Sequence, residues 1–264
     1  MVKERINVLS VQANRQETDR LQRVVARLVA TSPPGVNLLL IGEFRYRLLD
    51  NSQRFSVDIA YHWGGDLGAK QQELLALGRR VILGQVRREL GYAGSVSVRT
   101  GPDADSPNAS FVDLRFWKGT THIEVPLEVT QIVCLDPSII RTAGGTVHPT
   151  PSDADLIESK VIAVLNRIFL QHRDLLDIFL YGDKLRPDSP ARLKQKLAKM
   201  ELRPELVAQR RKDLQENSEY HATAIQKVID QQMEPTVAQQ MNSGGGGRAV
   251  LDSALNLLLK VCFP

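Results

Sequence analysis

The sequence contains few of the features that define specialised protein classes. Its 264 residues include two cysteines, Cys134 and Cys262, which match neither a disulfide framework nor the spacing of a zinc site. We expect two unpaired thiols in a reducing cytoplasm. No apolar run approaches the roughly 20 residues that span a bilayer, and residues 1–20 lack the apolar stretch of a signal peptide. The sequence therefore predicts a cytoplasmic protein with no membrane partner.

Aromatic residues are also scarce, at 5% of the chain, which leaves few rings on which nucleic acid bases could stack. What is present is ordinary for a globular protein, with 42% hydrophobic and 24% charged residues. The length suits one large domain or two smaller ones, with enough residues for a sizeable core.

The positive charge of the chain is concentrated in residues 183–216. This segment holds ten basic and six acidic residues, an excess of four that equals the net charge of the whole chain. Such a segment either attracts a phosphate-rich partner or forms a solvated helix face, and the sequence leaves both open. The basic residues are Lys184, Arg186, Arg192, Lys194, Lys196, Lys199, Arg203, Arg210, Arg211 and Lys212.

The hydrophobic pattern changes near residue 150. Before it, helical spacing alternates with strand-like spacing, and we predict helices at 16–30 and 68–90 and strands at 36–42, 54–63, 111–117 and 121–134. After it the spacing is helical, at 154–170, 173–182, 189–200, 204–216, 218–232 and 247–262. Residues 143–153 are expected to be a connector and 242–247 a flexible break. The prediction is an α+β protein: a mixed sheet with flanking helices in residues 1–150, and an all-helical half in residues 151–264.

Acidic residues lie on the polar faces of two of these strands. In RFSVDIAYHW, residues 54–63, Asp58 shares the polar face with Ala60. In the strand at 121–134, Glu124 and Glu128 share the polar face. Mg²⁺ prefers oxygen ligands and often combines one or two carboxylates with substrate phosphates. If the two strands are neighbours, these acids form a candidate cation site, and otherwise they form solvated strand faces.

The predicted helix at 154–170 and the segment after it add cations and further acids. Lys160 and Arg167 are seven residues apart and share one helix face. In the following RDLLD segment, Arg173 and Asp177 are four residues apart and can form an ion pair. Asp174 begins that helix, near its positive end. Taken alone, this segment is more typical of a helix start with an ion pair than of a site.

Together these segments resemble a known family. The stretches LLLIGEFRYRLL, RFSVDIAY, THIEVPLEVT, LIESKVIAVLNR and HRDLLDIF are similar in order and spacing to the nucleotidyltransferases of the AbiEii/AbiGii toxin group, within the polymerase-β-like superfamily. The shared elements are a glycine turn after a strand, an RxSxDxD strand, a third acidic strand, a helix with a lysine, and an RDxxD segment. The resemblance covers roughly residues 36–182 and implies a nucleotidyltransferase-like sheet.

The resemblance assigns roles position by position. It implies that Asp58 and Glu128 bind metal, with Glu124 as the close alternative to Glu128, and that Lys160 contacts phosphate. The implied catalytic residues are Asp58, Glu128, Lys160 and Asp174, and the implied nucleotide-binding residues are Gly42, Arg54, Ser56, Lys160 and Arg173.

Two departures from the family pattern affect this assignment. Glu43 and Phe44 replace the second glycine and the small residue of the turn that holds the triphosphate. Ala60 stands where the second metal-binding aspartate is expected. Since a shared ligand is needed by both ions of a two-metal site, we expect this chain to be inactive or weak, whether the alanine is natural or a substitution.

The resemblance implies a Mg²⁺- or Mn²⁺-dependent enzyme that moves a nucleotidyl group from an NTP to an RNA acceptor, for example the 3′ end of tRNA. It also implies a toxin or phage-defence role with a possible cognate antitoxin. The segment 183–216 would then hold the RNA backbone, with Lys194, Lys196 and Lys199 among the contacts. The alternative is a non-catalytic module of the same fold that binds nucleotide, RNA or a partner protein.

Overall fold

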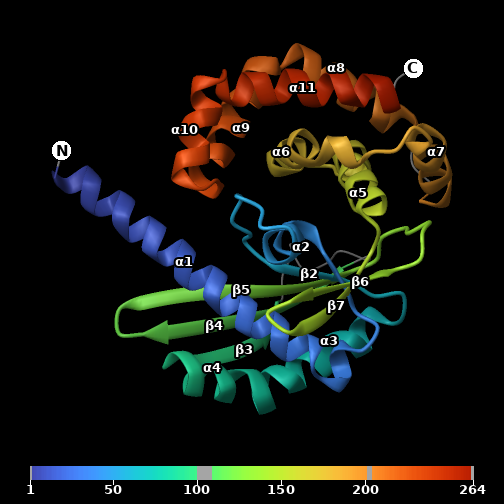
Figure 1. Cartoon of the computed structure of the whole chain (residues 1–264). Helices are drawn as coiled ribbons and strands as arrows, with labels where there is room; N and C mark the ends of the chain where they lie inside the picture. The colour runs from blue at the N-terminus through green and yellow to red at the C-terminus, as the bar shows by residue number, and fades with distance from the viewer. Residues whose placement is uncertain (1, 100–108, 201–203, 263–264) are drawn as a thin grey trace. The chain divides into compact units, whose positions relative to one another are not determined.

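The computed structural model describes residues 2–99, 109–200 and 204–262. The chain forms two compact units (Figure 1). Unit 1 comprises Met1–Ile132 and Ser138–Thr150, and unit 2 comprises Val133–Pro137 and Pro151–Pro264. The short segment 133–137 thus belongs to unit 2 although unit 1 precedes and follows it, so the chain passes between the units three times.

Unit 1 is built on a five-stranded sheet with the order β1-β2-β5-β4-β3. Its strands are β1 (Leu39–Ile41), β2 (Ile59–His62), β3 (Ala93–Val98), β4 (Ala109–Lys118) and β5 (Thr121–Thr130). β2 and β5 run parallel, whereas the other neighbours are antiparallel. β6 (Ile139–Ala143) and β7 (Thr146–Thr150) form a separate hairpin, whose turn is Gly144 and Gly145, both with positive φ.

One face of this sheet carries the core of unit 1. It packs against α1 (Val2–Ala30), α3 (Leu67–Leu77) and α4 (Leu83–Leu90) (Figure 1). Because strand side chains alternate between faces, Val125 and Leu127 of β5 point into this core while Glu124 and Glu128 point to the opposite face. We call that opposite face, which carries Asp58, Ala60, Asp113, Glu124 and Glu128, the acidic face.

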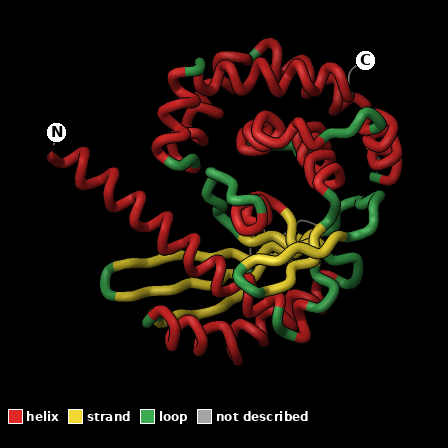
Figure 2. The backbone as a smooth tube through the Cα atoms, in the orientation of Figure 1, coloured by secondary structure: helices red, strands yellow, loops and turns green. Residues whose placement is uncertain are grey.

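Unit 2 is largely helical (Figure 2). Its helices are α5 (Asp153–Asn166), α6 (His172–Tyr181), α7 (Ser189–Lys199), α8 (Pro204–Glu216), α9 (Ser218–Gln232), α10 (Pro235–Ser243) and α11 (Gly246–Val261). Capping residues set the start of some of these helices. The Ser152 hydroxyl accepts a hydrogen bond from the N–H of Asp155 at 3.1 Å at the start of α5, and Pro235 is the first residue of α10.

The predicted α+β class is confirmed, and most predicted elements are present with shifted ends. The predicted strands at 36–42 and 54–63 shorten to β1 and β2, and the helix at 68–90 is α3 and α4 joined by a π-helical turn, Gly78–Ile82. Its predicted end at Gly91 is confirmed, since Gly91 is left-handed with φ 74°. Among the described residues, no helix combines the length and the hydrophobicity needed to cross a bilayer.

Among the helices and strands of the described residues, α2, β3, β6, β7 and α10 were not predicted. α2 (Gly42–Leu49) begins at the glycine expected only to form a turn, and β3 is a strand of small residues, AGSVSV. The expected connector at 143–153 was wrong, because it contains the turn and second strand of the β6–β7 hairpin. α10 precedes the expected flexible break at 242–247, and that break is a tight turn of left-handed glycines before α11.

Candidate functional site

Position 60 lies in a row of residues that crosses four elements of the sheet. Ala60 pairs with Ile41 of β1 on one side and with Glu128 of β5 on the other. Glu128 in turn pairs with Phe111 of β4. Paired residues on neighbouring strands direct their side chains to the same face, so the methyl group of Ala60 and the carboxylate of Glu128 are direct neighbours.

The turn after β1 closes on the same position. Gly42 has φ 73°, in the left-handed region that favours glycine. A Cβ placed on Gly42 would lie 3.3 Å from the Cβ of Ala60. The glycine turn, position 60 and Glu128 therefore meet at one place on the sheet.

Asp58 stands two residues before Ala60, directly ahead of β2, and is half-buried like Glu128. Glu124 lies further away, four residues or two strand repeats along β5 from Glu128, which is about 13 Å at ~3.3 Å per residue. Its carboxylate accepts from Arg115 Nε at 2.9 Å and is exposed. The register thus favours Glu128 over Glu124 as the neighbour of position 60.

These residues fit a divalent cation only in part. Asp58 and Glu128 offer hard oxygen donors, which suit Mg²⁺ when substrate phosphates complete its coordination. Within the described ranges, however, no three His, Cys, Asp or Glu side chains are grouped so that they could hold a metal ion without help. The methyl group of Ala60 stands where a third oxygen donor would complete the set.

The turn residue Glu43 has a partner inside the protein. Arg54 Nη2 lies 3.1 Å from Glu43 Oε2, and the two side chains are 2% and 4% exposed. The Ser52 hydroxyl donates to Glu43 Oε1 at 2.6 Å. A nucleotide phosphate would therefore compete with Glu43 for Arg54. Ser56, the other predicted nucleotide contact in this segment, donates its hydroxyl to the main-chain carbonyl of Asp58 at 2.8 Å.

The predicted site residues of unit 2 form an ion-pair cluster of their own. Lys160 Nζ lies 3.1 Å from Asp174 Oδ1 and 2.8 Å from Asp177 Oδ2. Arg167 Nη1 lies 2.5 Å from Asp174 Oδ2. Two cations thus face two buried carboxylates. This arrangement joins α5 to α6, and the Lys160 side chain is 18% exposed. Arg173, the remaining predicted contact, lies half-buried near the start of α6.

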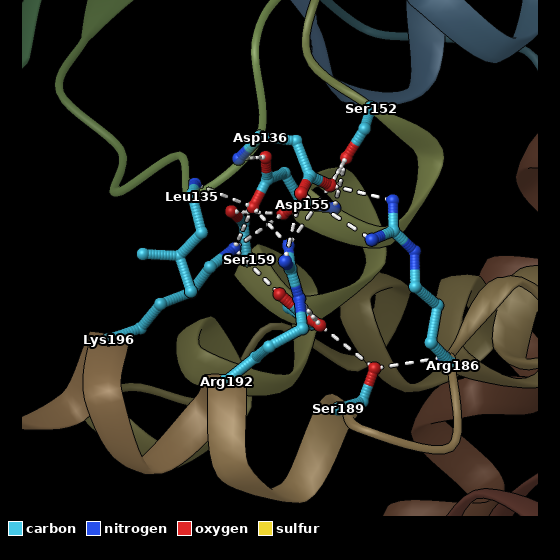
Figure 3. Close-up of polar contacts among 10 residues, drawn as sticks. Leu135, Asp136, Ser152, Asp155, Ser159, Arg186, Ser189, Arg192 and Lys196 are labelled. Atoms are coloured by element: carbon cyan, nitrogen blue, oxygen red, sulfur yellow. Dashed lines mark hydrogen bonds and ion pairs between the residues drawn. The ribbon is translucent and has the colours of Figure 1, made fainter.

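The described part of the basic segment 183–216 is mostly helical, in α7 and α8, but much of its charge is neutralised internally. Lys196 is 0% exposed, with Nζ 2.7 Å from Asp155 and 2.9 Å from Glu158. Arg192 reaches Asp136 at 3.0 Å, Asp155 at 2.8 Å and Glu158 at 2.8 Å. Figure 3 shows both side chains pointing from α7 toward this group of acids.

The expected RNA contact by Lys196 is therefore wrong, because its ammonium is enclosed by protein. The N–H groups of Leu135 and Asp136 donate to the Asp155 carboxylate at 3.0 and 2.9 Å. Although burial raises the pKa of Asp155, hydrogen bonds from Lys196 and from these two N–H groups bring it below its ordinary value. These ion pairs and hydrogen bonds, which we call the α5–α7 cluster, connect α5, α7 and segment 133–137. Lys194 and Lys199 are exposed.

Two further groups were missed by sequence analysis. His172 Nε2 and His221 Nδ1 lie 3.0 Å apart and connect α6 to α9. Residues so far apart in the sequence form no local pattern that predicts their contact. On the acidic face, Arg99 and Asp113 form a two-point ion pair. The alternation of FVDLRF in β4 could have placed Asp113 on the polar face.

Comparisons with known proteins give fold-level similarity. No protein-family model matches the chain, and no curated protein matches its sequence. A crystal structure described as a "putative nucleotidyltransferase" from H. pylori aligns with TM-score 0.56 and 16% identity, covering 93% of this chain and 95% of that one. The crystal structure of JHP933 from Helicobacter pylori aligns with TM-score 0.54 and 15% identity, covering 94% and 93%. At such identity the likeness shows fold alone, and this chain has a nucleotidyltransferase-like fold.

Proposed function

We propose that this chain is a member of the nucleotidyltransferase group that it resembles. Its substrates are an NTP, bound with Mg²⁺ or Mn²⁺, and an RNA acceptor such as the 3′ end of tRNA. Transfer by the chain as it stands is weak or absent because of Ala60. The biological setting that we propose is that of a toxin or phage-defence effector held in check by a cognate antitoxin.

In this proposal, each role in substrate binding belongs to a residue of unit 1. Asp58 and Glu128 hold the cation, and the left-handed turn at Gly42 brings main-chain N–H groups close to the phosphates. When bound, the cation neutralises charge on the transferred phosphoryl group and orients it. The carboxylates position that charge, and the tight packing of Gly42 against position 60 keeps the turn and the carboxylates together.

The observation that best supports this proposal is the register of β2 against β5. It sets Ala60 directly beside Glu128, with the Gly42 turn in contact on the other side. An aspartate at position 60 would therefore face both the second carboxylate and the phosphate turn. The alanine has no oxygen donor to offer at this position, which neighbours both.

A second candidate function is favoured by the Glu43–Arg54 pair. The carboxylate of Glu43, buried against Arg54, stands where the family pattern has the second glycine of the phosphate turn. Burying one charge without the other is costly, so the two residues depend on each other. A non-catalytic module that binds nucleotide, RNA or a partner protein accounts for this replacement as well as for Ala60.

The test is incubation with each labelled NTP, Mg²⁺ or Mn²⁺ and total RNA. The chain is compared with Ala60→Asp and with the matched control Ala60→Asn, which has the same shape without the charge. We expect label transfer to rise by roughly 10²–10³-fold in Ala60→Asp, the scale of restoring one electrostatic contact to a transition state, and not in Ala60→Asn. If Ala60→Asp folds, binds NTP and still transfers nothing, the non-catalytic function is correct. Strong transfer by the unchanged chain would refute the role given to Ala60.

The biological setting has its own test. Induced expression of the Ala60→Asp protein in a bacterial host is expected to stop growth, and the tRNA pool of the arrested cells is expected to carry added nucleotides at its 3′ ends. Asp58→Asn in the same background is the control, since it removes a proposed metal ligand. Growth arrest that persists in this control would separate toxicity from nucleotidyl transfer.

A further inference from the structure

The acidic face carries an arginine to which the proposed function gives no role. Arg99 follows β3 directly, and its main-chain N–H donates to the carbonyl of Phe111 at 3.3 Å. Phe111 pairs with Glu128. Arg99 therefore continues the row that already contains Ala60 and Glu128.

The guanidinium of Arg99 is held firmly in this position. Its Nε and Nη2 donate to the two oxygens of Asp113 at 3.1 and 2.5 Å. Its Cζ lies 4.7 Å from the centre of the Phe111 ring, a cation–π distance. An arginine fixed by a carboxylate and an aromatic ring loses little further freedom when it binds an anion.

The position of Arg99 suits an anion located over Glu128. Its charge lies over Phe111 on β4, and neighbouring strands are about 4.8 Å apart. The guanidinium is then roughly one to two strand spacings from Glu128, with Phe111 as the residue of the row between them. Hydrogen bonding to Asp113 raises the pKa of Arg99 against the effect of burial, and the charges of Asp113, Asp58 and Glu124 raise it further.

The other cations near the proposed site are less suited to this task. Arg54 is almost fully buried against Glu43. Arg115 is 57% exposed and bound to Glu124, and Glu124 lies further along β5 from position 60. Arg99 is 32% exposed, and its bonds to described residues use only the edge formed by Nε and Nη2. Among the described residues, none bonds to the edge at Nη1.

We propose that Arg99 binds the polyphosphate of the nucleotide on the acidic face, with Asp113 and Phe111 as positioning residues. The inference rests on the proposed function, since it concerns the same substrate. It adds a phosphate-binding arginine that lies outside the segments of the family resemblance assigned above. Arg99 supplies a permanent positive charge on a face where Ala60 offers no carboxylate to bind a cation.

The test measures binding of MgATP, MgGTP, MgCTP, MgUTP and magnesium tripolyphosphate by calorimetry, without any need for turnover. Arg99→Gln is expected to weaken binding of whichever nucleotide binds, and of tripolyphosphate, by about 10- to 100-fold, the range for loss of a charged hydrogen bond. Arg99→Lys, which keeps the charge but not the planar fork, is expected to fall in between. Arg115→Gln is the matched control and is expected to stay within about twofold, as for an exposed ion pair.

Removal of Arg99 alone leaves the nearly buried Asp113 without its partner, so folding is checked by circular dichroism. The double variant Arg99→Gln/Asp113→Asn replaces the ion pair by a neutral one and provides the same binding test in a stable background. Equal binding by the Arg99 variants and the unchanged chain would overturn this inference and leave the proposed function standing. Absence of any nucleotide or tripolyphosphate binding by both the unchanged chain and Ala60→Asp would overturn both.

Discussion

Replacing Lys196 by methionine removes one positive charge from the α5–α7 cluster. The ammonium of Lys196 is fully enclosed and lies 2.7 and 2.9 Å from Asp155 and Glu158. Methionine fills a similar volume but leaves two buried carboxylates with Arg192 as their shared counter-charge. Breaking a buried pair by removing one partner costs about 3–5 kcal/mol, because the remaining charge is uncompensated. We expect a loss of this order, since both acids are fully buried and Arg192 compensates only part of their charge.

The assay is urea unfolding followed by circular dichroism at pH 7, with Lys194→Met as the control. Lys194 lies on the same helix, two residues away, and is exposed. Substitutions at such surface positions usually change stability by less than about 0.5 kcal/mol. With a urea m-value of about 1–3 kcal/mol/M, the Lys196 variant is expected to unfold at least 1 M earlier than the control.

A Lys196→Met protein that unfolds together with Lys194→Met would refute the structural role of this cluster. In that case the acids would be protonated or rehydrated at little cost, and Lys196 would again be available for RNA. In an RNA-binding assay the two variants are expected to rank the other way. Lys194→Met is expected to weaken RNA binding and lower its salt dependence if α7 faces the acceptor, and Lys196→Met is expected to do neither in the protein that remains folded.

Three further predictions concern stability. Hydrogen bonding to Ser152 and Arg192 lowers the pKa of Asp136, and the pKa of Asp155 is also lowered. The two carboxylates therefore add to the free energy of unfolding above the unfolded-state pKa of about 3.9, and this contribution is lost as pH falls through their folded-state pKa values. Urea midpoints are expected to drop between pH 5 and 3, and a flat profile would contradict this. Burial and the nearby His221 lower the pKa of His172, so folding favours its neutral form and stability is expected to fall as pH drops below about 6.5. Burial also lowers the pKa of His62 and His148, so His172→Asn is expected to reduce this fall without removing it. Gly42→Ala forces a side chain into φ 73° and to within 3.3 Å of Ala60 and is expected to cost about 1–2 kcal/mol, whereas Gly64→Ala, with open space around it, is expected to leave the thermal midpoint unchanged.

The elements with strong hydrophobic periodicity were predicted, and those whose identity depends on pairing were not. β4 and β5 alternate clearly and were found within a few residues of their ends. β3 contains mainly small residues, and it is a strand because it pairs with β4 along its whole length. The β6–β7 hairpin contains Pro149 and two adjacent glycines, a composition that is typical of a connector, and the two glycines form its turn.

Charge partners were harder to predict than elements. Lys196 follows the buried Leu193 by three residues, so it falls on the apolar stripe of α7. That position could have indicated a buried lysine, but the composition of the segment gave only its total charge. The parallel pairing of β2 with β5, which sets Glu128 beside Ala60, depends on contacts between distant residues, and no local pattern in either strand specifies it.

The Glu43–Arg54 pair makes Ala60 one of two departures that meet at the same turn. An alanine introduced alone into an otherwise active enzyme would leave the phosphate turn small and Arg54 able to meet phosphate. Here the turn instead carries a buried glutamate that satisfies Arg54 and is itself bound by Ser52. Such a pair is stable only when both partners are present, so it cannot follow from a single change at position 60. Ala60→Asp therefore tests the proposed metal site alone, and the activity proposed for that variant depends on whether Gly42 and the neighbouring N–H groups can hold phosphate with Glu43 in place.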